Sequence, residues 1–439
     1  MSPKLTILVA VVVAIAIGAA LYLISNQAPP TTAPQPTPTT TQQTTPPTSP
    51  KTATSPSPAQ QTTPPPSPAT TRQTTPTPST ATTQQTTPVQ SSTSPQTTAT
   101  PPQYITIRDV LGREVQIKLP VRRVVAIGPG ALRLVVYLNA TDKLAGIEAL
   151  EKRPPQGRDY GYVLWAKNLT GLPVVGQGGP GSPVNFEAII EARPDVIIMT
   201  PTLANTPDEV QAKTGIPVVA VTYGTTGTIN FTELFYSLKI LGQILDREQR
   251  ARQLIAYMQS LIKDLERRTA NVTNRPKVYA GAISYRGGRP FTSTQSGFPP
   301  LVLLKTPSVA DKYNIMPGAQ ISWEALLKEQ PDVVFIDLGN YLTVVQDFNK
   351  SKDPYCSLNA FKQGKVYGVL PFNHYWTNIA TMLADAYYMG KVLYPDRFAD
   401  VDPAKKANEI YTEFLGMPLY QKIAKDFGGG FRQLSFPCG

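Results

Sequence analysis

The strongest constraint on the fold is a pattern that occurs twice in the chain. Residues 185–198 read Asn-Phe-Glu-Ala-Ile-Ile-Glu-Ala-Arg-Pro-Asp-Val-Ile-Ile, and residues 322–335 read Ser-Trp-Glu-Ala-Leu-Leu-Lys-Glu-Gln-Pro-Asp-Val-Val-Phe. Both copies place an acidic residue third, then apolar residues at helical spacing, a Pro-Asp pair and an apolar run. Two copies of one unit, 137 positions apart (185 to 322), predict two similar lobes.

Each copy predicts a short capped helix followed by a buried strand. Asn185 and Ser322 suit the N-cap position, because their side-chain oxygens can accept hydrogen bonds from the free backbone N–H groups of the first turn. Glu187 and Glu324 then lie in that first turn, where the positive end of the helix favours a carboxylate.

The rest of residues 104–439 alternates between apolar runs and helical patterns. This alternation is typical of parallel sheets with helices on both faces. The run 123–127 ends at Gly128-Pro-Gly130 and opens an amphipathic helix. Residues 105–119 alternate about a turn at 109–113 and predict a β-hairpin. The other predicted strands are 196–199, 218–221, 278–283, 333–336 and 366–370.

One long helix is predicted between the two sets of strands. Apolar residues recur at helical spacing from Asp246 to about Thr269, which corresponds to roughly 36 Å of helix. Asp246 is the predicted start of this helix, and Asn230 with Glu233 predicts a capping box at the start of an earlier one. A single crossing element of this length predicts a stiff connection between the lobes.

The N-terminal residues predict a membrane anchor. Residues 5–24 carry no charge and Lys4 precedes them, so the segment is long enough to cross the membrane core with the rest of the chain outside the cell. We therefore expect a single-pass transmembrane helix within residues 1–27. A cleaved signal peptide is the alternative, and it exports the chain as well.

Residues 28–103 predict a disordered stalk. They are almost all Thr, Pro, Gln, Ser and Ala, so they lack the apolar side chains that a core requires. The prolines favour an extended polyproline conformation, and the Ser/Thr content suits O-glycosylation. An unmodified linker is the alternative, with the same spacing role.

Residues 104–439 carry 38 basic and 30 acidic side chains. This balance favours an anionic ligand, but the basic residues are scattered, which argues against a nucleic-acid partner. The only cysteines are Cys356 and Cys438. Outside the cell they could form one disulfide that fixes the C-terminal tail, and the sequence leaves open whether they do.

Taken in order, several motifs resemble the helical-backbone solute-binding proteins of ABC importers, the class that binds ferric siderophores and cobalamin. The resemblance implies two Rossmann-like α/β lobes, 104–229 and 273–439, joined through a helical segment at 230–272. The motifs that carry it are Asp109-Val-Leu-Gly-Arg113, Arg123-Val-Val-Ala, Asp142-Lys-Leu-Ala-Gly-Ile, both Glu…Pro-Asp units, Leu241-Gly-Gln-Ile-Leu and Gly364-Lys-Val-Tyr367.

The resemblance also implies a partner. In that family the first-turn glutamates of the two lobes pair with arginines of the permease dimer, which works with its ATPase subunits. Glu187 and Glu324 occupy the matching positions. Stabilisation of the helix dipole alone, worth about 0.3 to 1 kcal/mol each, is the alternative. The rival function is a surface adhesin or sensor with the same fold and no transporter.

The ligand is expected where the strands of both lobes end. Arg286 and Arg289 could pair with carboxylate or catecholate oxygens, and aromatic side chains could pack on a flat chelate or macrocycle. An iron chelate is the first expectation and a corrinoid the second. Solvated arginines and half-buried tyrosines are the alternative at each position. The aromatic candidates are Tyr223, Tyr285, Tyr341, Tyr375 and Trp376.

Other chemistry finds little support in the sequence. His374 is the only histidine, which excludes a site of several imidazoles for bare zinc or manganese. It could ligate iron or cobalt axially, although a hydrogen-bonded surface histidine is the simpler interpretation. The run 176–181 fits a dinucleotide-binding pattern, but Pro183 follows it and no acidic residue stands about 20 positions on, so a flexible turn is expected. The chain lacks a Gly-x-Ser-x-Gly elbow and a Walker lysine, so we expect neither enzyme activity nor a cofactor.

Overall fold

The computed structural model describes residues 103–438 apart from Arg286. All of these residues belong to one compact unit. The expected membrane anchor and stalk lie outside the described residues. Among the described helices, none combines the length and apolar character needed to cross a membrane.

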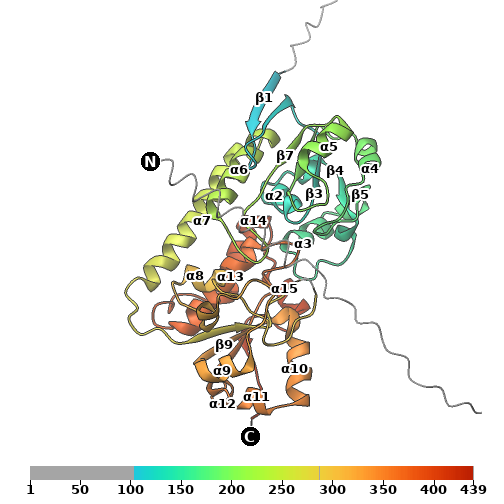
Figure 1. Cartoon of the computed structure of the whole chain (residues 1–439). Coiled ribbons are helices and arrows are strands. Elements are labelled where there is room, and N and C mark those ends of the chain that lie inside the picture. The colour runs from blue at the N-terminus through green and yellow to red at the C-terminus, as the bar shows by residue number, and fades with distance from the viewer. Residues whose placement is uncertain (1–102, 286, 439) are drawn as a thin grey trace, which may run out of the picture. The chain divides into compact units, whose positions relative to one another are not determined.

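The N-terminal lobe contains a parallel sheet with strands Val124–Ile127 (β3), Leu144–Glu148 (β4), Val174–Gly176 (β5), Val196–Met199 (β6) and Val218–Ala220 (β7). Their order in the sheet is β5-β4-β3-β6-β7; Figure 1 labels β3, β4, β5 and β7. Because this order reverses at β3, the loops after β3 and β6 border a crevice at the carboxyl ends of the strands.

The sheet of the N-terminal lobe is buried on both faces. Side chains alternate along β3, so Val124 and Ala126 join one apolar cluster, whereas Val125 and Ile127 join another. Helix α2 packs in the first cluster, and α4 and α5 pack in the second. The helices of this lobe are Ala131–Tyr137 (α2), Asp159–Ala166 (α3), Phe186–Ala192 (α4) and Pro207–Thr214 (α5), with 3-10 turns Thr141–Lys143 (η1), Ala149–Lys152 (η2) and Leu169–Gly171 (η3).

An antiparallel hairpin, Gln103–Arg108 (β1) and Glu114–Leu119 (β2), precedes this sheet as predicted. The buried Asp109 in its turn ties it to the lobe, because its Oδ2 accepts a 3.1 Å hydrogen bond from the backbone N–H of Ala220 in β7.

The C-terminal lobe contains strands Val278–Gly281 (β8), Val333–Asp337 (β9), Val366–Val369 (β10) and Arg432–Gln433 (β11). Their order is β11-β10-β9-β8, and only β11 runs antiparallel. Its helices are Pro299–Leu303 (α8), Trp323–Glu329 (α9), Tyr341–Lys350 (α10), Asp353–Cys356 (α11), Asn359–Lys362 (α12), Ile379–Leu393 (α13), Pro403–Leu415 (α14) and Tyr420–Asp426 (α15), with 3-10 turns Val309–Tyr313 (η4) and Leu338–Asn340 (η5).

The repeated sequence forms the same local structure in both lobes. The side chain of Asn185 accepts a 3.1 Å hydrogen bond from Ala188 N at the start of α4. The side chain of Ser322 accepts one of 3.2 Å from Ala325 N at the start of α9. Both helices have seven residues and end in a left-handed residue, so the predicted N-caps are confirmed.

The aspartate of each Pro-Asp pair has the same role in its lobe. Asp195 accepts a 2.9 Å hydrogen bond from the backbone N–H of Arg123, just before β3. Asp332 accepts one of 2.8 Å from the backbone N–H of Lys277, just before β8. Each carboxylate thus fixes the start of the first strand beside the second, which explains why the pair recurs.

Two consecutive helices, Phe231–Leu245 (α6) and Glu248–Thr269 (α7), connect the lobes. Asn230 caps α6 through Thr232 N and Glu233 N. The prediction that Asp246 starts the long helix was wrong: Asp246 adopts a left-handed conformation that ends α6, and α7 begins at Glu248.

Ion pairs near both ends of helix α7 attach it to the two lobes. Before its first turn, Arg247 pairs with Asp142 of the N-terminal lobe at 3.0 Å. In its last turn, Arg268 pairs with Asp400 of the C-terminal lobe at 2.6 Å. In Figure 1, α7 runs along the side of both lobes.

A disulfide joins Cys356 at the end of α11 to Cys438. The two Cα atoms are 5.3 Å apart. The bond fixes the C-terminal tail beside α11, in a cluster where the Phe436 ring lies 5.1 Å from the ring of Phe361.

Candidate ligand cleft

A cavity of about 580 Å³ lies between the two lobes. Its walls are loops that follow the carboxyl ends of strands in both sheets, which is where the sequence analysis expects the ligand. The volume is within the range of small-molecule sites, about 300 to 1,000 Å³. The lining residues are Pro129, Gln156, Pro180, Thr226, Ser284, Tyr285, Gly287, Gly288, Gly339, Asn340, Pro371, Asn373, His374, Tyr375, Trp376, Asp426 and Phe427.

Three of the predicted ligand residues line this cavity: Tyr285, Tyr375 and Trp376. His374 lines it as well. Tyr285 follows β8, and the other three follow β10, so the aromatic wall comes from the C-terminal lobe. Of the other predicted residues, Arg286 lies outside the described residues.

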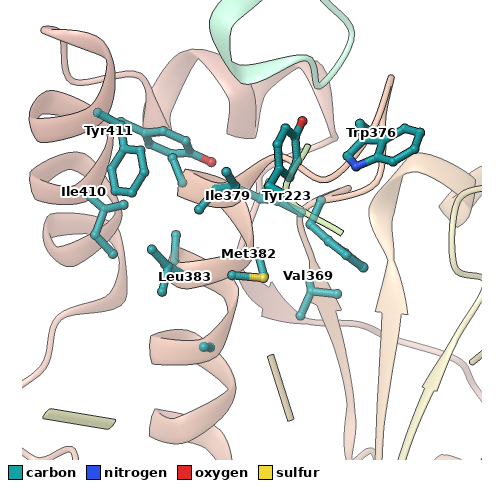
Figure 2. Packing of buried hydrophobic residues seen from close by; sticks show 14 of the residues in the cluster. Tyr223, Val369, Trp376, Ile379, Met382, Leu383, Ile410 and Tyr411 are labelled. Carbon is teal, nitrogen blue, oxygen red and sulfur yellow. The ribbon is translucent and has the colours of Figure 1, made fainter. Parts of the chain in front are cut away.

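Tyr223, Arg289 and Tyr341 do not line the cavity. Tyr223 is wholly buried, and its hydroxyl accepts a 2.6 Å hydrogen bond from Arg133. Its ring lies edge to face with that of Trp376, at 6.3 Å between centroids (Figure 2). Tyr223 therefore packs against a lining residue without lining the cavity itself.

Tyr341 and Arg289 are engaged elsewhere. The Tyr341 ring packs against Phe436 and lies under the guanidinium of Arg432, 5.3 Å from the ring centroid. Arg289 donates from Nε to the backbone oxygen of Tyr285, and its guanidinium lies 5.6 Å from that tyrosine's ring centroid. Arg289 therefore contacts a lining residue without lining the cavity itself.

The loop after β10 has an unusual backbone. Tyr375 and Trp376 both have positive φ angles, 53° and 77°. Left-handed conformations are uncommon for residues with a side chain, and they persist only where surrounding contacts hold them. Asn373 ties this loop to its own lobe through a 2.8 Å hydrogen bond to the backbone oxygen of Ser284, and further contacts come from the N-terminal lobe.

Arg133 of α2 is the main such contact. Its side chain is fully buried and forms an ion pair with Asp159 at 3.0 Å. One terminal nitrogen donates to the backbone oxygen of Tyr375 at 3.2 Å, and the other to that of His374 at 3.1 Å and to Asn378 Oδ1 at 2.6 Å. One guanidinium from the N-terminal lobe thus fixes both ends of the aromatic segment.

Glu148, the last residue of β4, makes a second contact with this loop. Its Oε2 accepts a 2.6 Å hydrogen bond from the Tyr375 hydroxyl, and its Oε1 accepts one of 2.9 Å from Gly128 N. Burial raises the pKa of the Glu148 carboxyl to about 7, although these two hydrogen bonds act in the opposite direction.

His374 is neutral at ordinary pH. Burial, together with the nearby positive charges of Arg158 and Arg133, lowers its pKa to about 4. A neutral imidazole has one donor and one acceptor, and the backbone of Gln156 interacts with the ring as a hydrogen-bond acceptor. The other ring nitrogen can take part in polar recognition without adding charge.

Arg133 and Glu148 were not singled out as site residues from the sequence, although Arg133 ends a loop, 128–133, that was expected to border the cleft. Both carry a signal that could have revealed them. Arg133 is the only charged residue within the apolar helix α2, and Glu148 ends an otherwise apolar strand. A charge at such a position must be paired or hydrogen-bonded when the element is buried.

Glu187 and Glu324 lie on the surface, away from the cavity lining. Both side chains are exposed, and neither forms an ion pair within the described part of the chain. Each occupies the first turn of a helix in the repeated unit.

The model of the family described as "Periplasmic binding protein" matches residues 124–371. The molybdate-binding protein MolA of Haemophilus influenzae is 24% identical over 331 residues, which cover 70% of this chain and 90% of MolA. The uncharacterized ABC transporter substrate-binding lipoprotein YvrC of Bacillus subtilis is 21% identical over 299 residues, which cover 67% of this chain and 87% of YvrC.

Solved structures share the fold. A periplasmic solute-binding protein of Veillonella parvula is 19% identical and superposes with a TM-score of 0.59 over 74% of this chain and 97% of its own. MolA bound to molybdate is 22% identical in that comparison and gives a TM-score of 0.58 over 72% of this chain and 98% of its own.

The family match spans more than half of the chain, and the two lobes, the connecting helix and the interlobe cavity agree with it. Members of this family are solute-binding proteins and not enzymes. The chain therefore belongs to the periplasmic binding protein family and is an extracytoplasmic substrate-binding protein of an ABC transporter.

Proposed function

We propose that this protein is the receptor of an ABC importer for an iron chelate such as a ferric siderophore, and that its N-terminal segment anchors it to the cell membrane. The observation that most strongly supports this proposal is the interlobe cavity of about 580 Å³ with aromatic side chains in its wall. A bare ion would leave most of this volume filled with water, whereas a chelate with planar groups has the size and the surfaces that the cavity offers.

The lining chemistry supports a chelate. Tyr285, Tyr375, Trp376 and Phe427 provide apolar ring surfaces on which aromatic or macrocyclic groups can pack. His374 adds a neutral polar group that can bond a ligand oxygen or ligate a metal. Residues 104–439 as a whole carry more basic than acidic side chains, which favours the negative charge that such chelates carry. Among the described lining residues, the charged side chain is Asp426.

We propose that Glu187 and Glu324 contact the permease. Both are exposed and without an ion-pair partner in the described residues, so their carboxylates are available to arginines on another protein. Their equivalent places in the two lobes suit a partner with two-fold symmetry, such as a permease dimer.

Molybdate is the second candidate ligand, because MolA, the relative with 24% identity, is a molybdate-binding protein by name. The backbone at Gly287 and Gly288 also lines the cavity, and successive backbone N–H groups in turns can bind oxyanions. A corrinoid, which is a macrocycle, is the third candidate ligand.

Isothermal titration calorimetry with the purified full-length protein tests the ligand class. The probes are a ferric tris-catecholate, sodium molybdate and cyanocobalamin. We expect binding of the ferric catecholate with a Kd of about 1 μM or tighter, equivalent to about −8 kcal/mol, and no comparable heat from the others. Binding of molybdate alone would replace the first proposal with the second.

A pair of variants shows whether binding takes place in the cleft. Tyr285→Ala removes a ring from the cavity wall and should weaken binding of the bound probe at least tenfold. Tyr341→Ala is the matched control, because Tyr341 follows β9 but does not line the cavity, and it should leave the affinity unchanged. Equal effects of both substitutions would place the ligand elsewhere.

A further inference from the structure

We propose that Glu148 is a positioning residue of the ligand cleft, and that its ionised carboxylate holds the loop of His374, Tyr375 and Trp376 against the N-terminal lobe. Protonation of Glu148 would loosen this loop and weaken ligand binding. The second statement rests on the proposed function, because it requires that the cavity between the lobes is the ligand site.

The hydrogen bonds of Glu148 join three loops at one point. Its carboxylate accepts from Gly128 N in the loop after β3 and from the Tyr375 hydroxyl in the loop after β10. That hydroxyl accepts a further hydrogen bond, of 2.9 Å, from Gly179 N in the loop after β5. When Glu148 is ionised, each of the three donors in this group of hydrogen bonds has an acceptor.

The same three loops form the cavity wall. Pro129 is adjacent to Gly128, and Pro180 is adjacent to Gly179; both prolines line the cavity together with Tyr375. The hydrogen bonds at Glu148 therefore lie directly behind the surface that a ligand would touch. Glu148 itself is 3% exposed and does not line the cavity, so it acts through these neighbours.

The glycine run between β5 and α4 allows this close approach. Gly178 has a φ of 80°, and a Cβ atom there would lie 3.0 Å from the Tyr375 hydroxyl oxygen and 3.2 Å from the Glu148 Cβ. The run that the sequence analysis interpreted as a flexible turn is packed against the two residues of the proposal.

The loop needs such contacts to keep its shape. Tyr375 and Trp376 both have left-handed backbone conformations, and the loop is held by Arg133 through its backbone and by Glu148 through the tyrosine hydroxyl. The arginine stays charged at all relevant pH values. Glu148 is therefore the contact whose strength can change near neutral pH.

The groups around Glu148 favour a change in its protonation near neutral pH. Burial raises its pKa to about 7, the repulsion of Glu151 in η2 adds to this, and the hydrogen bonds from Tyr375 and Gly128 oppose it. Glu151 is itself paired with Arg158 at 3.3 Å and accepts a hydrogen bond from Tyr160. A protonated Glu148 carries its own hydrogen, so the Tyr375 hydroxyl loses its acceptor or must compete for it.

The first test measures the loop directly, without a ligand. The chain has three tryptophans, at positions 165, 323 and 376. The emission of the full-length protein is titrated from pH 5 to 9, and the same titration of Trp376→Phe is subtracted to isolate the signal of Trp376. We expect a one-proton transition with a midpoint near pH 7 that disappears in Glu148→Gln, which keeps the shape of the side chain but not its charge.

Two further variants complete this test. Tyr375→Phe should also abolish the transition, because it removes the hydrogen bond and leaves Glu148 in place. Asp385→Asn is the matched control: Asp385 is a wholly buried carboxyl whose pKa burial raises well above its usual value, but it bonds to Leu370 N within its own lobe, and the transition should persist. A transition that persists in Glu148→Gln would overturn the proposal.

The second test measures binding of the ferric tris-catecholate at pH 8 and pH 6 to the wild type and to Glu148→Gln. Comparing the two proteins at each pH cancels the proton chemistry of the chelate. The ratio of wild-type to variant affinity should fall about tenfold, as the ionised fraction of a carboxyl with pKa near 7 does between these values.

The two tests separate failure of the proposal from failure of the proposed function. A Trp376 transition that depends on Glu148, with no chelate binding, would retain the positioning role and reject the iron chelate. Chelate binding with a ratio that does not change with pH would retain the iron chelate and reject the positioning role.

Discussion

Arg133 and Asp159 form an ion pair, 3.0 Å long, in which both side chains are completely buried. Asp159 begins α3 and Arg133 lies in α2, so the pair forms within the N-terminal lobe. The two terminal nitrogens of the arginine also donate hydrogen bonds to residues of the other lobe. The pair therefore connects the stability of one lobe to the shape of the ligand cleft.

Arg133→Met should destabilise the protein by about 3 to 5 kcal/mol, because it leaves Asp159 as an uncompensated buried charge. Urea denaturation at pH 7 measures this change. The matched control is Arg252→Met, which breaks an exposed pair with Glu248 and should change stability by about 0.5 kcal/mol or less. Equal effects of the two substitutions would contradict the role given to Arg133.

Reversing the charge of both docking candidates, Glu187→Lys with Glu324→Lys, should abolish uptake while ligand affinity stays at the wild-type value. The reason is that both side chains lie on the surface, outside the cavity lining. Uptake of the labelled ligand by cells and calorimetry with the purified protein measure the two properties.

Glu191→Lys is the control for this experiment, because Glu191 is exposed on the same helix as Glu187, one turn further along. It should leave uptake intact. Normal uptake by the double variant would reject docking through the two glutamates and favour an adhesin or sensor.

His374→Gln should change how stability depends on pH. The pKa of His374 is about 4 in the folded protein against 6.5 for an ordinary histidine, so the unfolded chain binds more protons between these values. Its contribution to stability therefore falls as the pH drops from 6.5 to 4.

The variant lacks this contribution, so at pH 4 it should lose less stability than the wild type, by at most about 3 kcal/mol, since each pKa unit corresponds to about 1.36 kcal/mol. Thermal or urea unfolding at pH 4 and pH 7 gives the difference. Because the chain has no other histidine, parallel pH curves for the two proteins would show that His374 is not buried in this way.

Cys356→Ser should destabilise the protein by about 2 to 5 kcal/mol, because the bond to Cys438 closes a loop across 82 positions. A reducing agent should have the same effect on the wild type and none on the variant. Denaturation curves that do not respond to the reducing agent would show that the bond does not form in solution.

The fold could be predicted from the sequence because the patterns that specify its helices and strands are local, and because one of these patterns occurs in both lobes. The caps at Asn185 and Ser322 and the apolar runs of β3, β6 and β9 each specify their own element. The sequence-based predictions fail where tertiary contacts determine the backbone conformation. Aspartate is common at the start of a helix, but Asp246 adopts a left-handed conformation that ends α6, and α7 begins at Glu248.

The site was less predictable than the fold. Tyr223 and Tyr375 are indistinguishable as tyrosines after apolar strands, but one is covered by Arg133 and the other faces the cavity. Which of them a ligand can reach depends on contacts between segments about 90 and 240 positions apart, and a single sequence does not reveal such pairings.

Helix α7 has a consequence for the transporter. It has 22 residues, about 33 Å at 1.5 Å per residue, and ion pairs attach it to both lobes. A helix of this length that is attached to both lobes helps to fix the distance between them, and the two lobes carry Glu187 and Glu324. A permease that binds both glutamates at once would require a fixed distance between them. Inserting one turn of helix into α7 would change that distance and prevent both glutamates from binding the same permease dimer.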